Sequence, residues 1–571
     1  MVARNVPRED NALWVSVPLT QDSLHLIAEL QPLAGIDGLI DAARQRSFLQ
    51  LRPELTLRRE RADGPSSSAA DLGLALKWRP RADWVLDATL RPDFSQVELD
   101  EPQLGGNTRY ALFMQEKRPF FLESRDVTGQ ALVPPGGSPR GLAGFYSRAI
   151  TDPVWGLRAT WRGADAEATM LSLHDRGGGQ VLRPAAFATR QFEQPADSQA
   201  SFVRAHHQMG QTGLALLASQ RDYGEGRWNR MLGSDFSRPL DDATSLRGHL
   251  LLSSTSAGFD DRGQLQRHSP EQGHYLWLQG RRRVEAWNHE LHLEELSPRF
   301  ANDNGFVSQS GIRRLHWQLQ RRTGALDFAV PGTELRWQPH DFSWDLTLQR
   351  TQTLADPARG VPAGEGVATL IQPGFFFTGS RQLELWTHLG LDRQRARSGG
   401  RLHAPRTLTL GFAMNPAPWF GYLETELVHG QRLDVDADRL GLGSALNAKA
   451  MLRLPLPAGM GLEWDQHLAW STIAKPDGST GLREWASQSA VIWHFSAHDS
   501  LRAIVQASGL QRAAEGVLPA QGAQQRAQSL LYQHRQGLGR LLSLGCSRSR
   551  EEPALSRGWE CFAKYSQDFW Y

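Results

Sequence analysis

Alternation of apolar and polar residues runs through most of this chain, and it constrains the fold more than any other feature. In the segment 71–79 every second residue is large and apolar: Leu72, Leu74, Leu76 and Trp78. A period of two places these side chains on one face of a β-strand. About 20 segments repeat the pattern over the 9–11 residues that a tilted membrane strand needs. The sequence therefore predicts an all-β chain that folds into a large antiparallel transmembrane β-barrel of about 20 strands.

Two other classes are excluded by composition. No apolar run approaches the roughly 18 residues of a membrane helix, so a helical membrane protein is excluded. The formal net charge of +2 on 571 residues gives no concentrated basic face, so no nucleic-acid partner is expected. A soluble all-β binding protein remains the alternative, because its strands alternate in the same way. Outward side chains distinguish the two, since only a membrane barrel needs an apolar outer band with aromatic rims.

The two ends of the chain predict an orientation. Apolar and aromatic residues share one face of the last strand: Trp559, Cys561, Ala563, Tyr565, Phe569 and Tyr571. Such a closing strand resembles the C-terminal signal of bacterial outer-membrane proteins, in which the last strand ends on the periplasmic side. Strands are predicted over 46–60, 71–79 and 83–91, which makes the tight turn 80–82 periplasmic. Other loops are expected at 177–200, 355–366 and 475–481.

One domain is predicted over 1–571, because no loop has the composition of an interdomain linker. Residues 1–45 are interpreted as an N-terminal lead-in, with 38–45 as a short helix candidate. The first residues lack the apolar h-region of a signal peptide, so none is visible although an outer-membrane location is predicted.

Residues 92–126 do not alternate. They mix carboxylates, an adjacent Lys-Arg pair and clustered aromatics. Irregular backbone at membrane depth must be buried in protein or line a water-filled cavity. We therefore predict that 92–152 is an insertion at the outer mouth or in the lumen, and that its charged residues form the candidate binding site: Asp93, Glu98, Asp100, Glu116, Lys117, Arg118, Glu123 and Arg148.

Several blocks of the sequence resemble a known family. They are PDFSQVELDEPQL (92–104), FMQEKRPFFLES (113–124), FYSRAITDPVWGLRA (145–159), ELSPRFANDNGFV (295–307) and ECFAKYSQDFWY (560–571). They resemble an uncharacterised barrel domain that usually follows a family-nine carbohydrate-binding module in Gram-negative envelope proteins. The resemblance covers nearly the whole chain and implies an outer-membrane location. Some members are labelled membrane-associated hydrolases, but no catalytic residue carries over. Neither leader nor module is visible in this chain, so glycan targeting through that module is not implied.

Familiar catalytic motifs are missing: there is no G-x-S-x-G, P-loop or H-E-x-x-H. We therefore assign no catalytic residue, metal or cofactor. Glu290, His292 and Glu294 share a strand face, where a polar lumenal wall is favoured over a metal site. A Ca²⁺ site of Asp93, Glu98, Asp100 and Glu101 is less favoured than ion pairs with Lys117, Arg118 and Arg125 or plain solvation of the carboxylates.

Cysteines and basic runs leave further alternatives. Cys546 and Cys561 fall almost opposite each other on the last two strands. Because cross-strand disulfides are geometrically demanding, two free or buried thiols are favoured over a bridge. The basic runs 281–283 and 393–397 lie near strand ends, where solvated turns are favoured over contacts with lipopolysaccharide phosphates.

The functional hypothesis is an outer-membrane barrel for passage or docking of an envelope substrate, with outer-membrane lipids or lipopolysaccharide, a glycan or an envelope protein as partners. The alternative is an envelope hydrolase in which Glu98 or Glu116 acts with Glu123 as an acid–base pair.

Overall fold

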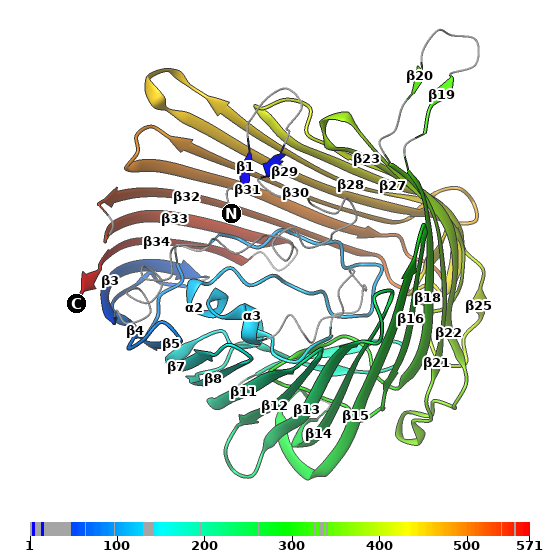
Figure 1. The fold of residues 1–571 in the computed structure, drawn as a ribbon, viewed down its shortest axis with the longest axis horizontal. Helices are drawn as coiled ribbons and strands as arrows, with labels where there is room; N and C mark the ends of the chain where they lie inside the picture. The colour runs from blue at the N-terminus through cyan, green and yellow to red at the C-terminus, as the bar shows by residue number, and fades with distance from the viewer. Residues whose placement is uncertain are drawn as a thin grey trace.

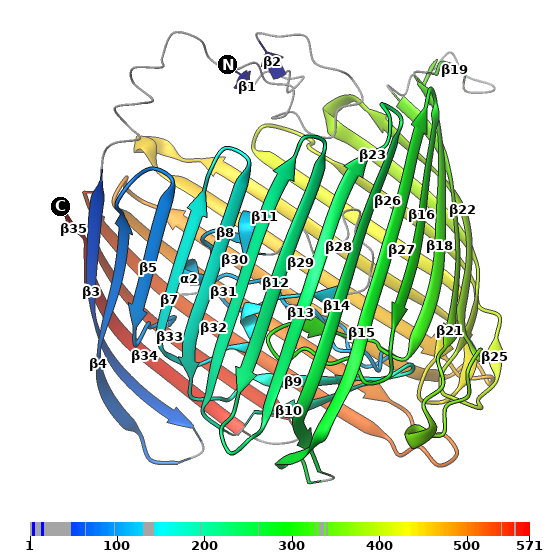
Figure 2. The same ribbon diagram turned by 60° about the horizontal axis from the view of Figure 1, so that its bottom comes forward.

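The computed structural model contains a closed barrel of 24 antiparallel strands in the part of the chain that it describes (Figures 1 and 2). The described residues are 3–5, 13–15, 47–62, 64–95, 98–128, 142–194, 196–260, 262–324, 326–329, 336–337, 341–537, 539–552 and 556–571. The barrel closes where β34 pairs with β3. The predicted transmembrane barrel is therefore confirmed, with more strands than the twenty or so expected.

The strands of the wall follow chain order. They are β3 (Phe48–Ala62), β4 (Ser67–Arg79), β5 (Trp84–Leu90), β7 (Pro153–Arg162), β8 (Ala166–Asp175), β11 (Ser198–Met209), β12 (Thr212–Asp222), β13 (Trp228–Pro239), β14 (Thr244–Phe259), β15 (Leu265–Val284), β16 (Trp287–Leu296), β18 (Ile312–Gly324), β21 (Asp341–Thr353), β22 (Gly366–Gly379), β23 (Leu383–Leu391) continued by β24 (Arg393–Arg395), β25 (Leu402–His403) continued by β26 (Arg406–Met414), β27 (Phe420–Asp434), β28 (Arg439–Pro455), β29 (Gly461–Ala474), β30 (Thr480–His494), β31 (Asp499–Arg512), β32 (Gln521–Gln536), β33 (Arg540–Glu552), and β34 (Ser556–Gln567) continued by β35 (Phe569–Trp570).

Shorter elements lie outside this wall. Two small hairpins pair β1 (Ala3–Asn5) with β2 (Leu13–Val15), and β19 (Phe328–Ala329) with β20 (Arg336–Trp337). Turns of 3₁₀-helix lie at η4 (Pro357–Arg359), η5 (Ser380–Gln382) and η6 (Pro457–Gly459). The rest of the predicted lead-in, including the helix candidate 38–45, lies outside the described residues.

The predicted strands 46–60, 71–79 and 83–91 are confirmed as β3, β4 and β5. The loops 355–366 and 475–481 are confirmed as connections between strands. The prediction of a loop at 177–200 is wrong in part, because β9 (Gln180–Pro184) and β10 (Thr189–Glu193) form a hairpin there. These strands have only five residues each, so they fall below the strand length used for the prediction.

Outward side chains form an apolar band around the wall. Leu72 is 70% exposed, Leu216 67% and Leu232 60%, and their neighbours on the same face are also apolar. Large exposed tryptophans gather at the strand ends on one side: Trp78, Trp287, Trp344, Trp419, Trp493 and Trp570. No helix among the described residues is long and apolar enough to cross a membrane. An apolar band with an aromatic rim fits lipid and is unfavourable in water.

The two ends of the barrel differ. Short turns such as 80–83, 163–165 and 210–211 lie at the tryptophan end, where the C-terminus also lies (Figure 2). The opposite end carries the long connections 91–152 and 297–311. Short periplasmic turns and long outer loops are the asymmetry of outer-membrane barrels. The connection between β18 and β21 is the exception, because it is long and lies at the periplasmic end. The chain is thus a β-barrel of the bacterial outer membrane, with the tryptophan rim facing the periplasm.

Candidate functional site

The connection between β5 and β7 folds into the lumen of the barrel (Figure 1). We call its described residues, 92–95, 98–128 and 142–152, the lumenal segment. It contains α2 (Pro119–Leu122), α3 (Arg125–Thr128), β6 (Leu142–Ala143) and η3 (Ser147–Ala149), and β6 pairs with β17 (Phe306–Val307) from a second connection. Two positions were predicted for this insertion, the outer mouth and the lumen, and its described residues lie in the lumen.

Apolar and aromatic packing holds the lumenal segment against one side of the wall. Phe121 and Ile150 are buried with Leu171 and Leu173 of β8, and Phe94 and Phe120 pack on them. A larger buried cluster lies inside the barrel beneath β11 to β18 and includes Tyr275, Trp277 and Phe300. This side of the lumen is therefore packed like the core of a globular protein.

A buried ion pair lies at the centre of the segment. Arg118 Nη2 lies 2.7 Å from Glu116 Oε2, and the two side chains are 5% and 6% exposed. Arg118 also donates to the carbonyl oxygens of Ser147 and Ile150, at 2.7 and 2.6 Å. Its guanidinium lies over the ring of Phe121, 4.3 Å from the centroid. Burial raises the pKa of Glu116, but hydrogen bonds from Arg118 and its charge outweigh burial, so the pKa lies below its usual value.

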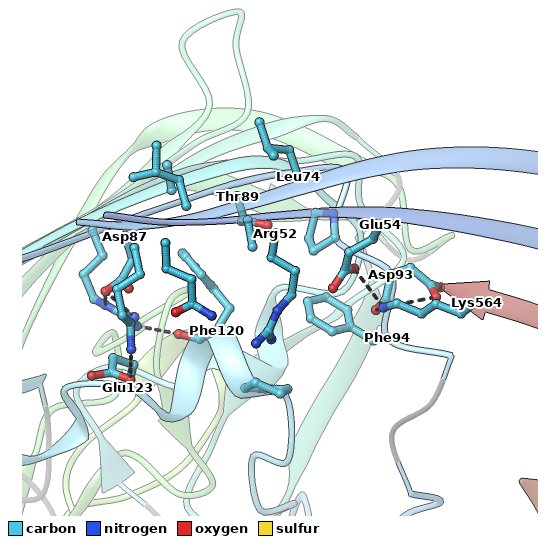
Figure 3. A pocket seen from close by; sticks show the side chains of 18 residues that line it. Arg52, Glu54, Leu74, Asp87, Thr89, Asp93, Phe94, Phe120, Glu123 and Lys564 are labelled. Atoms are coloured by element: carbon cyan, nitrogen blue, oxygen red, sulfur yellow. Dashed lines mark hydrogen bonds and ion pairs between the residues drawn. The ribbon is translucent and has the colours of Figure 1, made fainter. Parts of the chain in front are cut away.

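A cavity of about 230 Å³ separates the lumenal segment from β3, β4 and β5. Figure 3 shows Phe94 and Phe120 of the segment on one side and Arg52, Glu54 and Thr89 of the wall on the other. Its charges are paired within the wall or across to the segment. Lys564 Nζ lies 2.8 Å from Glu54, Lys77 Nζ lies 2.7 Å from Glu123, and Arg158 lies 2.7 Å from Asp87. The cavity thus presents hydrogen-bonding groups and aromatic edges with its charges already neutralised.

Residues 98–109 leave this side and run along the opposite wall, and we call them the strap. Glu98 contacts Arg502 of β31 at 2.9 Å, near the periplasmic end. Glu101 lies 3.4 Å from both Lys449 of β28 and His467 of β29. Because the remainder of the segment is packed against β3 to β8, the strap ties the two sides of the barrel together.

The outer end of the strap is held by backbone hydrogen bonds. Gly106 N donates to Glu484 at 2.8 Å, and Gly106 O accepts from Arg512 at 3.1 Å. The side-chain amide of Asn107 donates to Leu433 O at 2.9 Å and accepts a hydrogen bond from Val435 N at 3.1 Å. A Cβ atom on Gly106 would lie 2.4 Å from Leu510 Cδ1 and 3.1 Å from Glu484 Cδ. A side chain at this position would therefore displace at least the side chain of Leu510.

The predicted site residues all lie in the lumenal segment, but the structure does not gather them. Asp93 pairs with Arg58 of β3 at 2.8 Å, and Asp100 pairs with Arg148 inside the segment. Lys117 donates to Leu99 O at 2.9 Å. Among the described residues, no group of three or more His, Cys, Asp or Glu side chains could hold a metal ion.

The carboxylates form ion pairs, as one of the two alternatives predicted, but Lys117 and Arg118 are not their partners. Lys117 and Arg118 were expected to pair with Asp93, Glu98, Asp100 and Glu101. Those carboxylates bind wall residues or Arg148 instead, and the side chain of Arg125 lies outside the described residues. The wall partners Glu484, Arg502 and Arg512 were not predicted, because each looks like any inward polar residue of an alternating strand.

The geometry and charges around Glu98, Glu116 and Glu123 do not favour an acid–base pair. A general acid needs a raised pKa. Burial raises the pKa of Glu123 too, but the hydrogen bond and charge of Lys77 bring it below its usual value, as Arg118 does for Glu116. Glu98 lies in the strap and pairs with Arg502 of β31, on the other side of the lumen from Glu123 and its partner Lys77 of β4.

Two other expectations are resolved on the wall. Glu290 lies 2.6 Å from His292, whereas Glu294 pairs with Arg314, so the three residues act as separate parts of a polar wall. Cys546 and Cys561 form a disulfide, and the prediction of two thiols is wrong. Their Cα atoms are 4.1 Å apart, as in a non-hydrogen-bonded antiparallel pair, which brings the sulfur atoms within bonding reach.

Comparison with known proteins gives few matches in sequence. The model of a family described as a domain of unknown function, DUF5916, matches residues 47–132. This range holds β3, β4, β5 and the first part of the lumenal segment, and it contains 16 of the 18 residues that line the cavity. No curated protein matches the chain.

Solved barrels are similar at low identity. The ferric enterobactin receptor PfeA of Pseudomonas aeruginosa is 10% identical over 91% of this chain and 81% of that chain, with a TM-score of 0.40. The FrpB iron transporter of Neisseria meningitidis is 9% identical over 73% and 79%, with a TM-score of 0.42. OccAB4 of Acinetobacter baumannii is 9% identical over 92% and 99%, with a TM-score of 0.27. At such identities and scores, the similarity assigns no ligand or activity to this chain.

Proposed function

We propose that this barrel passes small, neutral, polar solutes across the outer membrane and that the lumenal segment is the constriction on their path. The observation that carries the proposal is the attachment of one short segment to both sides of the lumen. Its packed half, together with the β9–β10 hairpin and the connection 297–311, closes the side under β3 to β18, and the strap divides what is left along β27 to β31. The strap contacts are partly open to solvent, since Glu98 and Glu101 are 45% and 47% exposed.

The cargo follows from the charges of the lumen. An ion that passed the strap would have to compete with the pairs that Glu98 and Glu101 already form with Arg502 and Lys449. Hydroxyl groups need only add hydrogen bonds to the same carboxylates, guanidinium and ammonium groups. Sugars and glycan fragments are therefore our first candidates among envelope substrates.

Liposome swelling tests the proposal. Purified barrel in liposomes should admit glucose or glycerol faster than charged solutes of similar size. Gly106→Val should accelerate swelling, because its side chain meets Leu510 and Glu484 and displaces the strap. Gly105→Val is the matched control, since a Cβ atom there meets only Leu112 at 3.5 Å. If neither the wild type nor Gly106→Val admits any solute while both are folded, the proposal is wrong.

A further inference from the structure

A patch of arginines lies on the outward, lipid-facing surface where the barrel closes. Arg59 and Arg61 lie on β3, Arg526 on β32, and Arg548 and Arg550 on β33. The strand register brings them together: Arg526 is directly opposite Arg550. On β34, Cys561 is opposite both Arg59 and Cys546, and Trp559 is opposite both Arg61 and Arg548. The five side chains therefore occupy three consecutive cross-strand rows of one face, which we call the arginine patch.

Counting only residues that the structure describes, the patch carries more positive charge than its neighbours neutralise. Arg550 forms an ion pair with Glu552 at 2.5 Å, and Arg61 donates a hydrogen bond to Gly64 O at 2.8 Å. Within the described part of the chain, Arg59, Arg526 and Arg548 have no hydrogen-bond or ion-pair partner. Like charges directly opposite on a sheet are destabilising, and a cation on the lipid face of a barrel is unfavourable except near the interface. An anion from outside the protein would remove both penalties.

An apolar groove lies next to the patch, toward the middle of the membrane. It has a volume of about 750 Å³ and spans the outward faces of β3, β4 and β31 to β34. Leu57, Leu530 and Leu544 form its sides. Its floor is low because the outward side chains there are small: Ser68, Ala70, Cys546, Cys561 and Ala563. The disulfide holds β33 and β34 together beneath it.

The arginine patch and the groove are arranged like the headgroup and the acyl chains of a lipid in the outer leaflet. The patch lies at the strand ends opposite the tryptophan rim, at the level of the outer headgroups, and the groove extends from it toward the membrane centre. Guanidinium groups bind phosphate oxygens in pairs, so several arginines in adjacent rows suit a headgroup with more than one phosphate. A groove several strands wide suits more than one acyl chain.

We propose that the arginine patch and the groove bind one lipopolysaccharide molecule through its phosphorylated, acylated lipid A part. The arginines neutralise the phosphates and the groove holds acyl chains. This site is on the outside of the barrel and does not depend on passage through the lumen.

The test measures lipid A carried through detergent purification of the full chain, by mass spectrometry of the native protein. Arg526→Gln, Arg548→Gln and Arg550→Gln are combined in one variant. The matched control removes three exposed arginines elsewhere on the wall: Arg230→Gln, Arg350→Gln and Arg393→Gln. Both variants are checked for a folded barrel by heat-modifiable migration on gels. A third variant, Ala563→Trp, fills the groove and keeps the charges.

We expect the wild type and the control to retain lipid A, and the patch variant to retain at least tenfold less. Ala563→Trp should also lower the retained amount. In nanodiscs that contain lipid A or phosphatidylglycerol, the wild type should enrich lipid A. Equal retention in the patch variant and the control would overturn the proposal, as would equal enrichment of phosphatidylglycerol, which would indicate a general anionic-lipid surface.

Discussion

Replacing Arg118 with methionine should release the lumenal segment and leave the barrel intact. The substitution keeps an unbranched apolar chain against Phe94 and Phe121 but removes the guanidinium. The carboxylate of Glu116 then stays buried with no cation, holding only the Ser147 hydroxyl and two backbone N–H groups. The carbonyl oxygens of Ser147 and Ile150 lose their charged donor.

The expected loss can be estimated from these contacts. Removing one partner of a buried, hydrogen-bonded ion pair costs about 3–5 kcal/mol, because the other charge remains uncompensated. A loss of that size in the free energy of local opening accelerates amide exchange by roughly two to three and a half orders of magnitude, at a factor of ten per 1.4 kcal/mol. The strands of the wall should be unaffected, since their hydrogen bonds do not involve this pair.

Hydrogen exchange measured by mass spectrometry checks the estimate. Peptides from 98–128 should exchange faster in Arg118→Met, while peptides from β27 to β33 should not change. Adding Glu116→Gln to Arg118→Met should recover part of the loss, because the double variant buries no unpaired charge. Unchanged exchange in 98–128, or an equal change across the whole wall, would refute the idea that this pair holds the segment.

Three other outcomes are expected. In the wild type, the free energy of opening of 98–128, obtained from exchange corrected for the intrinsic rate, should fall as the pH falls below the usual Glu pKa of 4.5. The lowered pKa of Glu116 stabilises the folded segment above that pH, and the effect is lost on protonation; Glu116→Gln should show a weaker dependence, since Glu123 also has a lowered pKa. Replacing Cys546 and Cys561 with serine should lower the free energy of unfolding in urea by about 2–4 kcal/mol, since the bridge closes a loop of 15 residues. Lys77→Gln should lower the free energy of opening of 98–128 by less than about 1 kcal/mol, because the side chains of Lys77 and Glu123 are 27% and 32% exposed. A loss as large as that in Arg118→Met would contradict the role given to burial.

Much of the wall could be predicted from the sequence, because a membrane strand must alternate along its whole length. Leu72, Leu74 and Trp78 indicate β4 without knowledge of its neighbours, and the aromatic last strand gives the orientation. The short strands 180–184 and 189–193, which lie outside the wall, were missed because they carry too few residues for the pattern. The disulfide was missed because alternation places Cys546 and Cys561 on one face but does not say which kind of antiparallel pair they form.

The sequence predicted where the lumenal segment lies in the chain but not which wall residues it contacts. The break in alternation at Pro92 marks the segment, and the resemblance of EKRPFFLE to a known block points to the same residues. Its partners are hundreds of positions away, as Gly106 and Glu484 are, and they depend on strand register and on how an irregular chain crosses the lumen. The expected pairing of Asp93 with nearby cations failed for this reason, since Arg58 and Lys564 reach it from the wall.

Burial also decides where a solute could pass. Arg221 and Asp175 are fully buried and lie 2.5 Å apart, and Arg221 also donates to Ser198 and to Ala149 O. Opening that side would leave an unpaired charge in a buried core, at the several kcal/mol that a broken buried pair costs. The contacts of Glu98 and Glu101 with the opposite wall are half exposed, so breaking them costs about 1 kcal/mol or less each. For the proposed passage of solutes, we therefore expect a path beside Glu98 and Glu101, between the strap and β28 to β31, and not beside Arg221 and Asp175.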